Sequence, residues 1–301
     1  MNDKGEISRS AQMTAVGRFV GVFRHMPGLE RTAVLAALAA AVLLGMAGCR
    51  STGQRIELAS SFTAPKRDLD YTRGVLDSNA RRWTNLAATC EIVITNPQIP
   101  GPEHQVTIND GSLVFSKPGS IRITAPDSDQ PSVKMVGDGK TYRVDMPVFS
   151  STYSGKYSDP VTPQQGRISF LPPEVATALE PTILLAERAP MLIQLESHSG
   201  LYSLAFVTAP EPAVKPTGLI VLDRRRERPA SVEEYKLEDG SLRARIVYLD
   251  FEMLPVAGGE AAVVPTLFRI VYPEEQTAVQ VLLHDVTLNG KINPAQFKVP
   301  G

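Results

Sequence analysis

The chain has 301 residues, with 31 lysines and arginines against 32 aspartates and glutamates, which gives a formal charge of −1. A nucleic-acid-binding protein would carry a basic excess, so this balance argues against that class. The length is enough for one large hydrophobic core or two smaller ones, and no repeat of fixed period or low-complexity tract interrupts it.

The first 48 residues are predicted to be a signal peptide. Arg24, His25 and Arg31 precede an uncharged apolar run over residues 32–49, and basic residues followed by an apolar core and small residues are typical of a secretory signal. A membrane-spanning helix needs about 20 apolar residues, so this run is short for one. Translation from Met26 instead of the first methionine would give a signal of ordinary length.

The apolar run ends in Met46–Cys49, which resembles the lipobox of bacterial lipoproteins. In that family a diacylglycerol is attached to the cysteine thiol and the signal is cut just before it. Met46 departs from the usual leucine, and an uncleaved anchor or an ordinary signal peptide remains the alternative. The predicted group on the protein is therefore a covalent lipid on Cys49, with no other cofactor. Removal of 48 of the 301 residues would leave 253, with a formal charge of −3 and Cys90 as the one free thiol.

Residues 49–65 are predicted to be the lipidated N-terminus and a polar tether, and residues 66–301 the folded domain. The spacing of Leu69, Leu76 and Trp83 predicts a helix over 66–86. Later in the chain, prolines divide a segment into two short predicted helices, 174–180 and 182–188, within 171–190. The predicted strands are 87–95, 104–109, 112–117, 119–125, 132–137, 140–146, 191–197, 201–208, 217–223, 230–237, 242–251, 264–272 and 276–288.

Turn dipeptides and a period of two indicate an antiparallel sheet. Asp110-Gly111, Asp138-Gly139, Asp239-Gly240 and Asn289-Gly290 can each supply the positive φ angles of a two-residue hairpin turn. Between such turns, apolar residues alternate with polar ones, so consecutive strands present one apolar face and one polar face. This pattern predicts an antiparallel meander with a wide apolar face that the helices must cover, or that is left partly free for a ligand.

Three stretches resemble the LolA/LolB family, the periplasmic carrier and the outer-membrane receptor of lipoproteins. They are DGSLVFSKPGSIRITAP at 110–126, VGDGKTYRVDMP at 136–147 and VTLNGKINPAQFKVP at 286–300. The resemblance implies a mainly β (α+β) fold: a curved antiparallel half-barrel with an N-terminal helix and short lid helices on its concave face. It also implies a hydrophobic cavity that holds acyl chains. The lipobox is closer to the anchored receptor, although the chain is longer than either type and the receptor's exposed apolar loop has no evident counterpart.

The resemblance leads to a set of predicted acyl-chain ligands on the inward face, with ordinary hydrophobic core as the alternative role. Its partners would be a lipid or an acylated lipoprotein, the membrane through the N-terminal anchor, and a periplasmic carrier protein. Its location would be the cell envelope, on the outer membrane facing the periplasm. The predicted ligand-binding residues are Trp83, Leu113, Phe115, Ile121, Ile123, Val133, Met135, Tyr142, Val144 and Met146.

The sequence predicts no enzyme and no metal site. It has no Gly-x-Ser-x-Gly elbow, and its histidines at 104, 198 and 284 lack ligand spacing. The acidic residues at 233–239 are interpreted as a solvated strand end, and the basic run 224–228 as a charged turn or a contact with anionic lipid headgroups. Since fold does not fix function, the alternative function is that of a structural or regulatory envelope lipoprotein, sensing like RseB or binding a protein partner, without lipid cargo.

Overall fold

The structure is a computed structural model, and it describes residues 68–125, 133–158, 169–187, 192–196, 201–208, 215–223, 226–236 and 238–300. The chain divides into a unit that ends at residue 63 and a compact unit that begins at residue 64. The predictions for the signal peptide, Cys49 and the tether at 49–65 lie outside the described residues, as do those for His198 and for Arg224 and Arg225.

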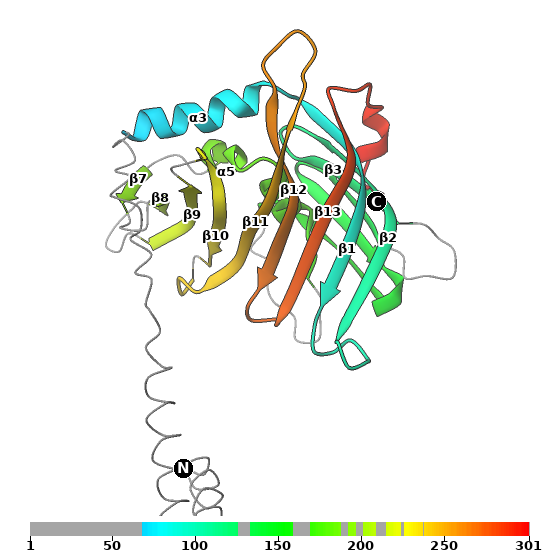
Figure 1. Cartoon of the computed structure of the whole chain (residues 1–301). Coiled ribbons are helices and arrows are strands. Elements are labelled where there is room, and N and C mark those ends of the chain that lie inside the picture. Colours follow the sequence, from blue (N-terminus) through cyan, green and yellow to red (C-terminus); the bar gives the residue numbers. More distant parts are fainter. Residues whose placement is uncertain are drawn as a thin grey trace, which may run out of the picture. The chain divides into compact units, whose positions relative to one another are not determined.

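One open, antiparallel sheet of 13 described strands forms the body of the molecule, and it curves around the short helices (Figure 1). Its order is β6-β5-β4-β3-β2-β1-β13-β12-β11-β10-β9-β8-β7, so β6 and β7 form the two edges. Every neighbouring pair is antiparallel, and β1 pairs with β13, which joins the two ends of the domain. This architecture confirms the predicted fold class.

The strands follow one another in a meander on each side of the β1–β13 pair. Their bounds are β1 (Asn85–Thr95), β2 (Gln105–Ser116), β3 (Ser120–Thr124), β4 (Lys134–Asp138), β5 (Thr141–Met146), β6 (Ser151–Lys156), β7 (Leu192–Glu196), β8 (Leu201–Thr208), β9 (Lys215–Asp223), β10 (Arg228–Tyr235), β11 (Leu242–Leu254), β12 (Ala262–Tyr272) and β13 (Thr277–Leu288).

Five helical segments accompany the sheet in the described part of the chain. They are α3 (Leu69–Arg81), the 3₁₀ turn η2 (Pro147–Phe149), α4 (Pro172–Leu179), α5 (Thr182–Glu187) and the 3₁₀ turn η3 (Pro294–Phe297).

The helix α3 is shorter than predicted. Its N-cap Asp68 accepts a hydrogen bond of 2.7 Å from the backbone N–H of Tyr71, and the helix ends at Arg81. The expected end at residue 86 was wrong because Asn85 already pairs in β1 with Ser116 of β2. Trp83 therefore lies in the link between helix and sheet rather than on a helix face.

Hairpins are confirmed at two of the four predicted positions, between β4 and β5 and between β10 and β11. The turn between β4 and β5 consists of Gly139 and Lys140, one residue further along than predicted. Asp239-Gly240 lies in a longer connection, closed by a hydrogen bond from the N–H of Lys236 to the carbonyl of Ser241, so a two-residue turn there was wrong. Asp110-Gly111 instead lies inside β2, where the register with β1 shifts and Asp110 has a φ of 56°. The predicted strands 104–109 and 112–117 are therefore one bulged strand. A Cβ at Gly111 would lie 2.9 Å from Sγ of Cys90, which accounts for glycine at this bulge.

Asn289-Gly290 ends β13 without a following strand, so the prediction of a hairpin there was wrong. The Asn289 side chain instead accepts a hydrogen bond of 2.7 Å from the backbone N–H of Thr84.

Strand β6 was not predicted because its sequence, STYSGK, has no apolar alternation. It pairs with β5 at the edge of the sheet, where half-exposed polar residues are compatible with solvent.

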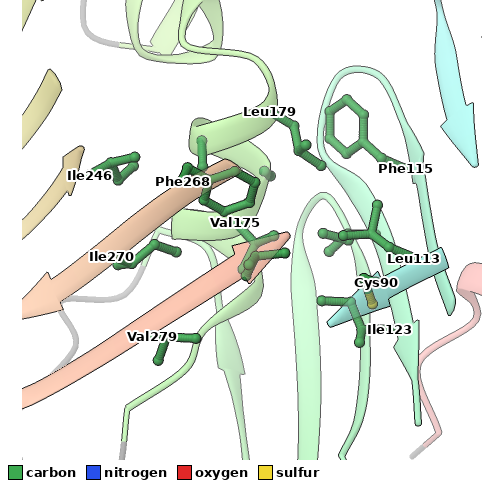
Figure 2. Close-up of a cluster of buried hydrophobic side chains, with 14 of the residues drawn as sticks. Cys90, Leu113, Phe115, Ile123, Val175, Leu179, Ile246, Phe268, Ile270 and Val279 are labelled. Carbon is green, nitrogen blue, oxygen red and sulfur yellow. The ribbon is translucent and has the colours of Figure 1, made fainter. Parts of the chain in front are cut away.

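The short helices α4 and α5 confirm the two predicted between residues 171 and 190, and we call them together the cover, residues 172–187. Figure 2 shows Val175 and Leu179 of α4 between Leu113 and Phe115 of β2 on one side and Phe268 and Ile270 of β12 on the other. The cover thus lies on the concave face, in contact with both halves of the sheet. In the part of the chain described here, no helix has the length and apolar content needed to cross a membrane.

Candidate functional site

The ten predicted acyl-chain residues lie together in one hydrophobic cluster on the concave face. Strand register explains how they meet, because Leu113 lies opposite Ile123, Ile123 opposite Met135, and Met135 opposite Val144. Their polar neighbours along each strand alternate to the other face. The prediction that these side chains share one face is therefore confirmed. The cluster contains Trp83, Leu113, Phe115, Ile121, Ile123, Val133, Met135, Tyr142, Val144 and Met146.

The cluster is closed in this structure, since the exposed fraction of the ten residues lies between 0 and 5%. Residues outside the predicted set complete it from the cover and from the second half of the sheet. The apolar alternation of strands β11 to β13 was the signal that could have added several of them. The missed members include Val175, Leu179, Ile246, Phe268, Ile270, Val279 and Val281.

Trp83 has a buried donor with no acceptor. Its ring centroid lies 5.8 Å from that of Phe115, and the ammonium of Lys117 lies 3.8 Å from its ring centroid. Its exposed fraction is 2%, and Nε1 has no hydrogen-bond partner among the described residues. A buried N–H without an acceptor is rare in folded proteins, so an acceptor brought by a ligand would find a donor here.

Lys117 attaches the C-terminal end of α4 to the sheet. Its ammonium lies 2.5 Å from a carboxylate oxygen of Glu180, which directly follows α4, and it donates to the carbonyl of Ala80 in α3. Burial lowers the pKa of Lys117, and the charge and hydrogen bond of Glu180 oppose that change. One side chain from the turn after β2 thus contacts α3 and the end of α4.

Glu174 attaches the N-terminal end of α4 to the sheet through a buried charge cluster. Its Oε1 lies 2.7 Å from Nη1 of Arg243 in β11, and Nη2 of Arg243 pairs with Glu234 in β10. Glu174 is fully buried, and neither of its carboxylate oxygens accepts a well-oriented hydrogen bond in the described structure. Burial therefore raises the pKa of Glu174 to about 7, although Arg243 opposes the rise.

The charge cluster corrects one prediction. Glu234 was expected to lie on a solvated strand end, but its exposed fraction is 3% and it pairs with Arg243. Alternation within β10 places Glu234 on the inner face beside Val232, whereas its neighbour Glu233 pairs with Arg245 in a more open setting. A carboxylate is retained inside because the arginine supplies its counter-charge.

Tyrosine hydroxyls of the sheet provide further polar contacts, one to the cover and two to the residues directly before it. Tyr272 accepts a hydrogen bond of 3.4 Å from the backbone N–H of Leu171, and Tyr248 donates one of 3.4 Å to the carbonyl of Thr177. Tyr153 donates to the carbonyl of Phe170 at 3.0 Å. Burial raises the pKa of both Tyr248 and Tyr272, so both hydroxyls keep their protons. The cover is therefore held by polar contacts at its margins and by apolar packing beneath it.

No cluster of metal-ligating side chains occurs in the described residues. His104 makes a local contact of 2.9 Å between Nδ1 and the carbonyl of Ile99, and His284 lies exposed on β13.

These features define a class of protein: an open, curved antiparallel sheet whose apolar concave face is closed by short helices. No family model and no curated protein matches the chain. Solved structures with a similar arrangement include an outer membrane lipoprotein-sorting protein domain from Vibrio parahaemolyticus, at 12% identity and a TM-score of 0.46. That match covers 74% of this chain and 94% of the other.

Two further solved structures are similar to the chain. A LolA superfamily protein from Nitrosomonas europaea has 12% identity and a TM-score of 0.46, with 75% of this chain and 97% of the other covered. A DUF1329 family protein from Desulfovibrio piger has 13% identity and a TM-score of 0.42, with the same coverage. At these identities and TM-scores the three structures do not identify the family of this chain.

Proposed function

We propose that this protein is a lipid-anchored envelope protein that binds acyl chains, or the acyl groups of lipoproteins, on its concave face. The observation that carries the proposal is the wide apolar inner face covered by two short helices, which polar contacts hold at their margins. The site would consist of the ten clustered residues, which are Trp83 and nine residues on or directly beside β2 to β5. The binding would be non-covalent, and no bond would be made or broken.

Opening of the cover would expose the site. An acyl chain that entered between the cover and the sheet would bury its methylenes against isoleucine, valine, methionine and phenylalanine side chains, each methylene contributing about 0.8 kcal/mol. The buried N–H of Trp83 supports this proposal because an ester carbonyl at the head of an acyl chain would accept its hydrogen bond. Charged contacts at both ends of α4 support a cover that separates from the sheet as one unit.

The anchor and the location belong to the same proposal. They rest on the lipobox-like Met46–Cys49 and on the basic and apolar residues before it. Lipidation of Cys49 would place the domain on the envelope membrane, where acyl chains or a periplasmic carrier protein would reach it. We assign it to the outer membrane, facing the periplasm.

The test is lipid binding by the protein purified from the membrane fraction. We expect native mass spectrometry to show a non-covalent lipid in addition to the covalent anchor. A titration with a fluorescent fatty acid should then compare the wild type with Met135→Glu, which places a charge on the inner face. The matched control is Val136→Glu, one residue along the same strand and on the outer face. Affinity should fall at least about tenfold in the first variant only.

A melting curve must accompany the titration, because Met135 is buried and a glutamate there can unfold the domain. Val144→Thr serves as the second variant, since it keeps the shape of the side chain and adds one hydroxyl to the inner face. A folded inner-face variant with wild-type affinity, or a wild type that binds no fatty acid, contradicts the proposal.

One observation favours a second candidate function, the binding of a protein partner without lipid cargo. Leu249 and Met253 of β11 are large apolar side chains with exposed fractions of 51% and 71%. Under this alternative, Met253→Lys would abolish partner binding, whereas fatty-acid binding would be absent from the wild type as well.

A further inference from the structure

On the outer face of the sheet, the C-terminal segment, residues 289–300, contacts β3 and β4 through its turn η3. Figure 1 shows this segment in red beside β3. The segment begins with a hydrogen bond of 3.0 Å from the N–H of Asn289 to the carbonyl of Asn85. Its 3₁₀ turn η3 is capped by Asn293, and Arg122 of β3 donates to the carbonyl of Gln296 at 3.4 Å. Phe297 is buried beneath it, with an exposed fraction of 6%.

Between this segment and the sheet lies a pocket of about 380 Å³ that is open to solvent, and we call it the cavity. Small-molecule sites in proteins span about 300 to 1,000 Å³, so the volume suits a small ligand. The floor consists of polar residues at strand ends, and the opposite wall comes from the C-terminal segment. The lining residues are Asn85, Ser116, Ser120, Asp138, Ile292, Pro294, Phe297 and Lys298.

The four floor residues point away from the acyl site. Each is the sequence neighbour of an inward residue: Asn85 precedes Leu86, Ser116 follows Phe115, Ser120 precedes Ile121, and Asp138 follows Gly137. Because side chains alternate across a strand, the cavity and the acyl site lie on opposite faces of the same strands. The two sites can therefore be tested independently.

Asn85 contributes an unsatisfied acceptor to the floor. Its Oδ1 is buried and has no hydrogen-bond partner in the described part of the chain. The amide nitrogen of the same side chain faces the hydroxyl of Thr84 at 3.5 Å. Buried polar atoms in folded proteins are almost always paired. The Oδ1 atom is therefore available to accept a hydrogen bond from an N–H or O–H group of a ligand.

The floor and the C-terminal wall of the cavity carry opposite charges. The Asp138 carboxylate is fixed by backbone N–H groups of Lys140 and Thr141, at 2.8 and 2.7 Å. Burial alone would raise the pKa of Asp138, but these hydrogen bonds outweigh burial and the pKa lies below its usual value. The carboxylate is therefore charged at neutral pH. Lys298 brings an ammonium from the C-terminal segment.

We propose that this cavity binds a small zwitterion with a primary ammonium and a phosphate, the chemistry of a phosphoethanolamine group. The ammonium would donate to Asn85 Oδ1 and Asp138, and the phosphate would accept from Lys298 and from the hydroxyls of Ser116 and Ser120. Ile292 and Phe297 would cover the carbon chain between the two charges. The group could come from a free glycerophosphodiester or from the headgroup of a membrane lipid.

Isothermal titration of the full-length protein in non-ionic detergent tests the proposal with three soluble probes. Glycerophosphoethanolamine should bind saturably. Glycerophosphocholine should bind about tenfold more weakly or less, because its quaternary ammonium has no N–H to donate to Asn85. Glycerol 3-phosphate, which lacks the ammonium, should also bind more weakly.

Variants of the two charged residues, Asp138 of the floor and Lys298 of the wall, complete the test. Lys298→Gln and Asp138→Asn should each weaken glycerophosphoethanolamine binding by about tenfold. Lys291→Gln is the matched control, since it removes an exposed lysine of the same segment that does not line the cavity. Lys298 is exposed, so its variant should keep the melting temperature of the wild type and remains informative if Asp138→Asn disturbs its turn.

Competition identifies the source of the ligand. Displacement of the soluble probe by nanodiscs containing phosphatidylethanolamine, but not by those containing only phosphatidylcholine, would assign the site to a lipid headgroup. Resistance to both would assign it to a free phosphodiester. The proposal is overturned if glycerophosphoethanolamine shows no saturable binding, if all three probes bind alike, or if neither Lys298→Gln nor Asp138→Asn changes its affinity.

Discussion

At the scale of single residues, Glu174 is a buried carboxyl between the cover and the sheet, so we expect its ionisation to affect the stability of the closed cover. In the closed protein its pKa is about 7, against an ordinary value of 4.5 when water reaches the carboxyl. The protonated form is thus favoured inside, and opening or unfolding releases a proton as pH rises. The stabilising effect of the buried acid is fully present below about pH 4.5 and is lost as pH rises through about 7.

We therefore predict that the free energy of unfolding falls between pH 5 and 7.5, by on the order of 3 kcal/mol from this group. Glu174→Gln should flatten that dependence and stabilise the domain at pH 7.5, since the neutral amide needs no counter-charge. Arg243 keeps Glu234 as its partner in the variant. Urea unfolding at a series of pH values is the measurement.

Glu252→Gln, an exposed change on the same strand as Arg243, is the control for the loss of a glutamate. It should leave the pH dependence as in the wild type. Identical curves for Glu174→Gln and the wild type would show that this carboxyl does not set the closed state.

At the scale of single elements, we expect the cover to open at a lower cost in free energy than the sheet. Helix α4 has eight residues, and isolated helices of that length are not stable in water, so its structure depends on its contacts. Central strands such as β1 and β12 are instead paired on both sides. Local opening of the cover should therefore cost less free energy than opening of the sheet.

We predict that backbone amides of the cover exchange with solvent faster than those of β1, β12 and β13, and that exchange slows when oleate binds. Lys117→Met should accelerate exchange in α4 and at the end of α3, because Lys117 contacts both Glu180 and Ala80. Hydrogen exchange with mass spectrometry measures this. Lys156→Met, at the end of the edge strand β6, is the control. Cover amides as slow as those of β12 in lipid-free protein would contradict a cover that opens.

At the scale of the whole molecule, the predicted lipid anchor would join the folded unit to the membrane. Cys49→Ser should block lipid attachment and leave an unprocessed precursor, because the signal peptidase of lipoproteins acts after the thiol is modified. Labelled palmitate should enter the wild type and not the variant, and the precursor should run more slowly on a gel. Cys90→Ser is the control, as Cys90 is buried in the sheet. Equal labelling of Cys49→Ser and the wild type would remove the anchor from the proposal.

The sequence was sufficient to predict much of the fold and the inner face, because both depend on local patterns. Ile123, Met135 and Val144 could be assigned to one face from a period of two alone, since a shift of one residue would bury their charged neighbours. Asp138-Gly139 predicted the hairpin between β4 and β5 because glycine readily adopts a positive φ, and Gly139 has a φ of 86°. The short helices on either side of Pro181 followed from proline positions in the same way.

Tertiary structure alone decided which distant residues meet. Glu174 and Arg243 are 69 positions apart, and no local period in the sequence predicts that a helix and a strand will bring their charges together. For the same reason the bulge at Asp110-Gly111 could not be told from a hairpin, because the register of β2 against β1 depends on the whole sheet. Likewise, Asn85 and Lys298 share a cavity only because β1 pairs with β13 and carries the C-terminal segment back across the outer face.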